Sequence, residues 1–298
     1  MDSQQAAGST HAMSDKKQQD LEGASKPAGM LDRSSGMAES EHESLKTRLW
    51  KHVDGEVDSN MCTLQLELYC FMTGWVDSIS FAAAFIFSGF QTGNVVQLAA
   101  ALARLFSGPD RSTYFHPADR LAICSLFSFI LGAGLGQIGD RIGAKKRLWL
   151  IGATLLQAGF MMIAFITIFV SGQQSIASDR GDIAWTRPLS FVTLGFMSGS
   201  MGLQGIVAKR LNTHYGTTVV LTTIWCELIS DPGLFKWRHR VPSRDHRLIA
   251  VLLLFAGAFI GRIIVNFIGS GATLGIGAGI KALIAVSFWF VPSKGIQK

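Results

Sequence analysis

Between residues 61 and 291 the chain alternates between long apolar segments and short polar breaks. Several of these predominantly apolar segments are about 18 or more residues long, which is enough for an α-helix to cross the hydrocarbon core of a bilayer. The pattern therefore predicts an all-α fold, a polytopic membrane helical bundle. The eight predicted segments are 61–88, 92–106, 120–138, 148–170, 188–208, 216–230, 247–268 and 272–291.

Two of the eight segments, 92–106 and 216–230, are short for a span, and each begins at a break rich in Gly and Thr. If they only enter the membrane, the bundle has six spans plus two short, broken half-helices. Each half then has three spans, so the halves are inverted, as in many transporters. If they cross, there are eight spans in parallel halves. The Lys and Arg residues of the loops slightly favour six spans, and both versions place the N- and C-termini in the cytoplasm.

The second half of the membrane region repeats the order of segments in the first. The pattern Gly132-Ala133-x-x-Gly136 recurs as Gly257-Ala258-x-x-Gly261, each time in a segment that opens with Arg-Leu. We therefore predict two internal repeats, at about 61–171 and 187–291. Small residues at this spacing allow two helices to approach closely, so we expect these glycines to join the halves.

The composition supports a membrane domain preceded by a polar tail. Only 16% of the residues are charged, against about 25% in soluble domains. Residues 1–58 have almost no periodic apolar positions and are predicted to be a disordered cytoplasmic tail, followed by a membrane domain at 59–292 and a short tail at 293–298. Near the end of this tail Leu45, Leu49, Trp50 and Val53 recur at helical spacing, which fits either a short amphipathic helix at the membrane surface or a solvated linker. The net charge is +6, and the basic residues cluster in the short loops between apolar segments. They form no basic surface interleaved with aromatic residues, so nucleic acid is not an expected partner.

Little in the sequence points to catalysis or to metal binding. None of the four cysteines forms a C-x-x-C pair, and we expect buried free thiols. The histidines are scattered and no H-E-x-x-H motif occurs. Neither a G-x-S-x-G motif nor a phosphate-binding loop is present. We therefore predict no enzyme activity, no metal and no cofactor.

Four short patterns carry a resemblance to a known family. They are Gly-Trp-Val-Asp-Ser at 74–78, Gln-Thr-Gly-Asn-Val-Val-Gln-Leu at 91–98, Met-Gly-Leu-Gln-Gly at 201–205 and Thr-His-x-Gly-Thr at 213–217. The chain resembles the YoaK-like family of multi-pass membrane proteins, domain of unknown function 1275, and its N-terminal tail is similar to that of fungal members. The resemblance covers about 61–291 and implies an intact membrane protein but very little about activity.

The chain departs from this family in one place. Similar proteins tend to read Thr-Gly-Thr where this chain reads Tyr215-Gly216-Thr217. The glycine that opens the helix is retained, but the hydroxyl before it is lost. The two halves therefore do not present the same hydroxyl group.

Asp77 is a carboxylate inside an otherwise apolar segment. An ionised carboxylate in hydrocarbon is costly, so Asp77 is expected to face the interior of the bundle and to find a partner there. One hypothesis is a proton- or cation-coupled site, and the alternative is a structural hydrogen bond between Asp77 and the broken backbone of the next helix. The possible charge partners are Glu67, Glu227, Arg262 and Lys281.

The polar breaks before the two short segments are the second candidate feature. Backbone N–H groups at the start of a helix, together with its dipole, favour anions, and transporters use this at broken helices. Plain N-capping by Thr92 or Asn94 is the alternative. In the second half, Gln204 takes the place of Asp77. The predicted substrate- or ion-binding residues are Asp77, Thr92, Gly93, Asn94, Gln204, Gly216 and Thr217.

Duplication and broken helices together favour a small-solute or ion transporter with its site at the repeat interface. The alternative is a non-transporting membrane scaffold or assembly protein. The expected partners are the lipid bilayer, a small solute or ion, and a second copy of the chain in a homo-oligomer.

Overall fold

The computed structural model describes residues 45–107, 115–179, 182–211, 213, 218–219, 222–235 and 241–294. The chain divides into two compact units, Met1–Arg48 and Leu49–Lys298, and every helix from α3 onward belongs to the second. The elements are α2 (Leu45–Asp54), η1 (Ser59–Met61), α3 (Thr63–Ala84), α4 (Gln91–Ala103), α5 (Pro117–Leu135), α6 (Gln137–Ile142), α7 (Arg147–Ser171), α8 (Pro188–Leu211), α9 (Thr222–Ile229), α10 (Pro242–Ser287) and η2 (Phe288–Phe290).

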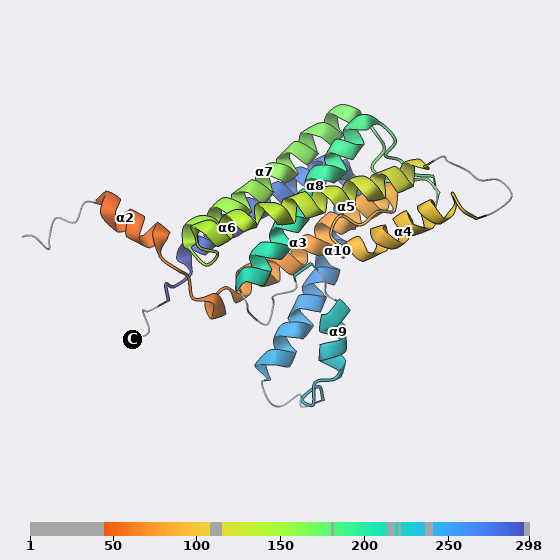
Figure 1. Ribbon diagram of the computed structural model, residues 1–298. Helices are drawn as coiled ribbons and strands as arrows, with labels where there is room; N and C mark the ends of the chain where they lie inside the picture. Colours follow the sequence, from red (N-terminus) through yellow and green to blue (C-terminus); the bar gives the residue numbers. More distant parts are fainter. Residues whose placement is uncertain are drawn as a thin grey trace, which may run out of the picture. The chain divides into compact units, whose positions relative to one another are not determined.

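The predicted all-helical fold is confirmed for the described residues, and the helices of the second unit pack side by side (Figure 1). Within the described ranges, four stretches are long and apolar enough to cross a membrane, which indicates a membrane protein: Pro117–Ile142, Arg147–Ser171, Pro188–Leu211 and Pro242–Phe290. The stretch Pro188–Leu211, helix α8, lies deepest. In its most apolar window 67% of the residues are buried inside the protein, against 28% to 39% in the others.

Helix α10 breaks at Gly269, whose φ of 83° and ψ of 168° are not helical. A positive φ is easily reached only by glycine, because it has no Cβ. The break separates the predicted segments 247–268 and 272–291. It is held by the loop after α7, since the Ser270 N–H donates to Ser175 Oγ at 2.8 Å.

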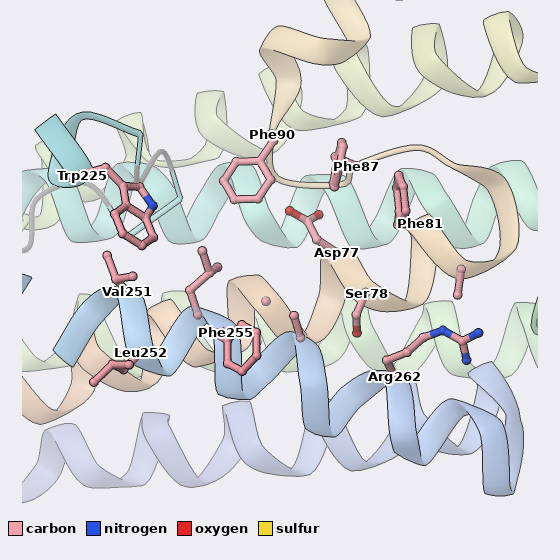
Figure 2. Close-up of a pocket in the computed structure, with 14 residues that line it drawn as sticks. Asp77, Ser78, Phe81, Phe87, Phe90, Trp225, Val251, Leu252, Phe255 and Arg262 are labelled. Carbon is pink, nitrogen blue, oxygen red and sulfur yellow. The ribbon is translucent and has the colours of Figure 1, made fainter. Parts of the chain in front are cut away.

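The two halves of α10 lie along α3 in opposite directions. The first half runs parallel to α3, because Gly257 faces the Phe71 backbone and Gly261, further along, faces Trp75. The second half is antiparallel: Trp75 Nε1 donates to the Thr273 carbonyl at 3.2 Å, whereas Gln65 Nε2, at the start of α3, donates to the Ser287 carbonyl at 3.3 Å. The two halves therefore form a helical hairpin, seen as the light blue and lavender ribbons of Figure 2.

Two helix pairs, α3 with α10 and α5 with α8, approach each other through glycines in the same way. A Cβ on Gly74 would overlap the Leu254 carbonyl and lie 2.7 Å from Ala258 N. A Cβ on Gly202 would overlap the Phe129 carbonyl and lie 2.9 Å from Ala133 N. Gly257 and Gly132 meet the facing backbone just as closely. Because the backbones touch, only glycine fits at these positions.

The segment ends predicted from the sequence lie within a few residues of the helix ends in most cases. The short segment 92–106 corresponds to α4, which begins at Gln91. The largest difference is in the segment 216–230, where the described helix α9 covers Thr222–Ile229. Residues 214–217, 220 and 221 of that region lie outside the described part of the chain.

Residues 45–58 were predicted to belong to the disordered tail, but the structure shows them ordered. They form α2 and then an extended stretch in which Val57 N donates to the Lys145 carbonyl at 3.0 Å. Val57 is fully buried, and Arg147 donates hydrogen bonds to the carbonyls of His52 and Val291. The helical spacing of Leu45, Leu49, Trp50 and Val53 agrees with α2, whereas the contacts of Val57 and Arg147 join residues far apart in the sequence and could not be predicted from it. The remainder of the predicted tail, residues 1–44, lies outside the described residues.

Candidate functional site

Asp77 lies on α3, buried to 4% exposure, and its two carboxylate oxygens have different surroundings. Oδ1 accepts hydrogen bonds from the backbone N–H groups of Ser88 at 2.7 Å and Gly89 at 2.8 Å. Oδ2 has no hydrogen-bond partner among the residues that the structure describes. One oxygen therefore holds the polar break, while the other is buried without a hydrogen-bond partner in the described part of the chain.

The chain between α3 and α4 turns back to reach Asp77. Helix α3 ends at Phe85, which takes the left-handed conformation with φ 56° and ψ 26°. The Ser88 hydroxyl donates to Ser80 Oγ at 3.0 Å, which fixes the returning chain against α3. A Cβ at Gly89 would lie 3.1 Å from Asp77 Oδ2, so glycine gives the carboxylate its room.

The predicted N-capping by Thr92 or Asn94 is wrong. Helix α4 begins one residue earlier, at Gln91, and its N-cap residue Phe90 makes no side-chain cap. Thr92 and Gly93 are exposed within the first turn. Asn94 is buried and donates to the Phe87 carbonyl at 2.8 Å and to Ser125 Oγ at 3.1 Å. Because the turn before α4 folds back onto α3, Asn94 stabilises that turn and does not cap the helix.

A cavity of about 730 Å³ lies beside Asp77, between α3, the turn before α4, α9 and the first half of α10 (Figure 2). Its wall is almost wholly apolar and includes five aromatic rings. Arg262 also lines it, but its Nη1 donates to Asn266 Oδ1, and Figure 2 shows the guanidinium pointing away from the carboxylate. The aromatic residues are Phe81, Phe87, Phe90, Trp225 and Phe255.

Lys281, a predicted partner of Asp77, lies in a different polar cluster. Its ammonium nitrogen is fully buried, 2.7 Å from Gln157 Oε1 and 2.7 Å from Gln204 Oε1, and 5.5 Å from the centre of the Tyr69 ring. Gln204 in turn donates to Thr73 Oγ1 at 2.9 Å. No ion pair of Lys281 is found in the part of the chain that the structure describes.

The two clusters are connected by one face of α3. Gln65, Tyr69, Thr73 and Asp77 follow one another at four-residue intervals, and all four are buried. Residues four apart in a helix lie on one face, so they form a buried polar row along α3. Tyr69 and Thr73 were not among the predicted site residues, although their four-residue spacing from Asp77 is visible in the sequence. Gln157, the polar residue in the middle of α7, was not among them either.

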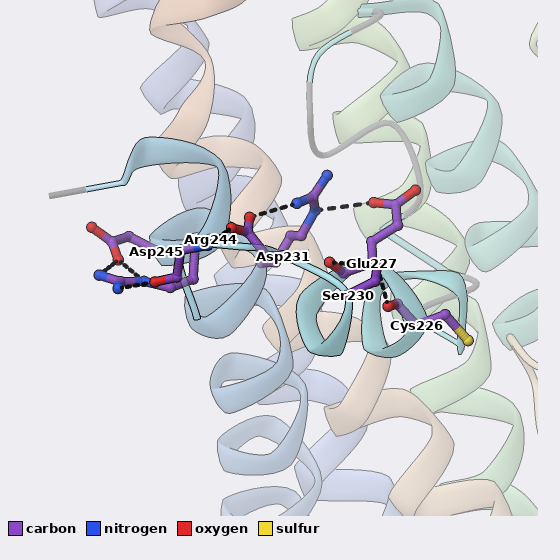
Figure 3. Close-up of polar contacts among 8 residues, drawn as sticks. Cys226, Glu227, Ser230, Asp231, Arg244 and Asp245 are labelled. Carbon is purple, nitrogen blue, oxygen red and sulfur yellow. Dashed lines mark hydrogen bonds and ion pairs between the residues drawn. The ribbon is translucent and has the colours of Figure 1, made fainter. Parts of the chain in front are cut away.

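The other predicted charge partners lie elsewhere. Glu67 is half-buried on α3. Glu227 on α9 accepts from Arg247 Nε at 3.0 Å, and Arg247 also donates to Asp231 at 3.2 Å (Figure 3). These contacts join α9 to α10. Gly216 and Thr217 lie outside the described residues, so the predicted counterpart of the first polar break has no structure here.

Within the described ranges, no group of three or more His, Cys, Asp or Glu side chains is placed to hold a metal ion. The four cysteines are free. Cys62 and Cys70 are buried as predicted, whereas Cys124 is half-buried and Cys226 exposed.

A family model for proteins of unknown function, DUF1275, matches residues 65–287. Comparisons with curated proteins and with solved structures give no match. The matched range contains the polar row of α3, the break before α4, the aromatic cavity and Lys281. The family suggested by the sequence patterns is thereby confirmed, and the chain belongs to the DUF1275 family.

Proposed function

We propose that the protein is a multi-pass membrane transporter for a small, positively charged solute or ion, with Asp77 as the residue that binds it. The observation that carries this proposal is the free Oδ2 of a buried carboxylate on the wall of a large cavity. Burying a polar acceptor without a partner is costly, so such groups are retained mainly where they have a use.

Six spans fit the helices better than eight. Helix α3 is not among the four apolar stretches, but it has 22 residues, about 33 Å at 1.5 Å per residue, and its polar row Gln65, Tyr69, Thr73 and Asp77 is buried inside the protein. Helix α3, together with α5, α7, α8 and the two halves of α10, gives six proposed spans. The 13 residues of α4 and the 8 of α9 are short for a span. We propose that both termini are cytoplasmic, as the loop charges suggest.

The glycine contacts support two inverted repeats. In the proposed duplication α3 corresponds to α8, and α5 to the first half of α10. Gly74 contacts the first half of α10 as Gly202 contacts α5, so the first helix of each repeat packs on the other repeat. The cavity is then lined by Asp77 and Phe87 from one repeat and by Trp225 and Phe255 from the other. It therefore lies at the interface between the repeats, where transporters of this kind bind their substrates.

A membrane scaffold is the second candidate, because Asp77 Oδ1 has a structural role at the break before α4. The variant Asp77→Asn separates the two. The amide oxygen can still accept from Ser88 and Gly89, so the fold is expected to remain. The charge at the cavity is lost, so a transporter loses its cation-binding residue.

We expect purified protein in liposomes to carry at least one of three cations when an inside-negative potential is imposed: protons, read with a trapped pH dye, radiolabelled Rb⁺, or radiolabelled tetraethylammonium. Asp77→Asn should lower that flux about tenfold or more, as expected when one member of a buried charged contact is removed. Asp140→Asn is the matched control, because Asp140 is an exposed aspartate paired with Arg210 at 2.7 Å. Flux of all three probes equal to that of empty liposomes contradicts transport and favours the scaffold.

A further inference from the structure

We propose that the cavity beside Asp77 binds an organic ammonium ion that carries apolar substituents. This rests on the proposed function only for the position of the site, since binding can be measured apart from transport.

The first step concerns charge. Asp77 is buried and its Oδ2 lacks a hydrogen-bond partner within the described residues, while two neutral N–H groups satisfy Oδ1. Arg262 shares the cavity wall but forms no ion pair with Asp77 in the described chain, and its guanidinium is bonded to Asn266. The site therefore presents one uncompensated acceptor. A positively charged ligand complements it, whereas an anion is repelled.

The second step concerns the rest of the wall. Five aromatic rings surround the cavity, and Phe87 lies between two of them, with ring centres 4.9 Å from Phe81 and 5.7 Å from Phe90. The faces of aromatic rings attract ammonium groups, as in the aromatic sites that bind quaternary amines. A bare metal ion needs several oxygen ligands, and this wall offers few besides the Asp77 carboxylate. The wall therefore fits an organic cation better than an inorganic one.

The third step concerns size and access. A volume of about 730 Å³ is in the range of sites for small organic ligands, roughly 300–1,000 Å³. Phe255 and Trp225, from the second half of the chain, are 67% and 51% exposed, so both rings lie at the mouth of the cavity. An apolar substituent of the ligand would rest against these rings while its ammonium group reaches Asp77.

The test compares benzyltrimethylammonium with neopentylbenzene, an uncharged molecule of the same shape, as ligands of the purified full-length protein in detergent. We expect the ammonium to bind about tenfold or more tightly than its uncharged analogue. Asp77→Asn should abolish this preference, whereas Asp77→Glu, which restores a carboxylate, should retain part of it. Phe255→Leu should weaken binding of the ammonium about threefold to thirtyfold.

Asp140→Asn and Phe235→Leu are the matched controls, since Asp140 and Phe235 are exposed and do not line the cavity. All variants should elute as the wild type does in size-exclusion chromatography. Equal binding of the two probes overturns the inference and indicates an apolar groove of the kind that holds a lipid chain. A preference that survives Asp77→Asn also overturns it, because the ammonium is then recognised without the carboxylate.

The two proposals fail separately. Selective ammonium binding without any cation flux would support this inference and contradict the transport function. Proton or Rb⁺ flux that depends on Asp77, without selective binding of benzyltrimethylammonium, would support transport and contradict the inference.

Discussion

Gly132→Ala is expected to remove most of the folded protein, whereas Gly134→Ala, two residues further along α5, is expected to leave it intact. A Cβ on Gly132 would overlap the Gly199 carbonyl and lie 2.7 Å from both its carbon and its Cα. These atoms are backbone, so α5 and α8 must separate. Overpacking of a buried contact costs about 1–3 kcal/mol or more, a large share of a typical stability of about 5–15 kcal/mol.

Gly134 is the matched control, because a Cβ there meets nothing within 4 Å. The measurement is the fraction of monodisperse protein after extraction into detergent, together with its thermal unfolding midpoint. Gly257→Ala against Gly279→Ala repeats the comparison on α10, where Gly257 faces the Phe71 backbone and Gly279 faces open space. Equal yields within each pair would show that the close packing of these helices is not required for the fold.

Lys281→Met is the second substitution expected to destabilise the protein strongly. The variant has nearly the same shape, but it leaves Gln157 Oε1 and Gln204 Oε1 without the ammonium donor that lies 2.7 Å from each. A buried acceptor left without its donor costs about 1–3 kcal/mol, so we expect a loss of roughly 2–5 kcal/mol in the free energy of unfolding. Lys209→Met, at an exposed residue near the end of α8, is the control.

A double variant distinguishes a lost hydrogen bond from lost packing. Gln157→Leu removes one of the stranded acceptors, and it also removes Gln157 Nε2, which is buried without a partner among the described residues. Lys281→Met with Gln157→Leu should therefore be more stable than Lys281→Met alone. If the double variant is less stable by the sum of the two single effects, the polar cluster does not act as a unit.

The hydrophobic pattern predicted the fold better than the site. Apolar runs set the length of each helix, so most ends and the break at Gly269 could be located within a few residues. Asp77 and the break before α4 were predicted to be neighbours, and they are. The contact uses Ser88 and Gly89, because the turn folds back before the helix starts, and sequence spacing does not reveal that path.

The pairing of polar residues across helices could not be predicted, since it depends on the rotation of each helix. Gln204 was expected to take the place of Asp77, but it lies with Lys281. Under the proposed duplication, Gly74 and Gly202 make matching contacts, so Asp77 would correspond to Gly205. That alignment differs by one residue from the one suggested by the sequence, and one residue turns a helical side chain by about 100°.

The most direct test of the transport account is whether the cavity can be reached from both sides of the membrane. Ser78 lines the cavity next to Asp77. In a background without Cys62, Cys70, Cys124 and Cys226, Ser78→Cys would be treated with a membrane-impermeant trimethylammonium thiosulfonate in right-side-out and in inside-out vesicles. We predict labelling in both orientations, slowed in each by benzyltrimethylammonium. Labelling from one side only, or from neither, would contradict a carrier that exposes Asp77 alternately to the two sides.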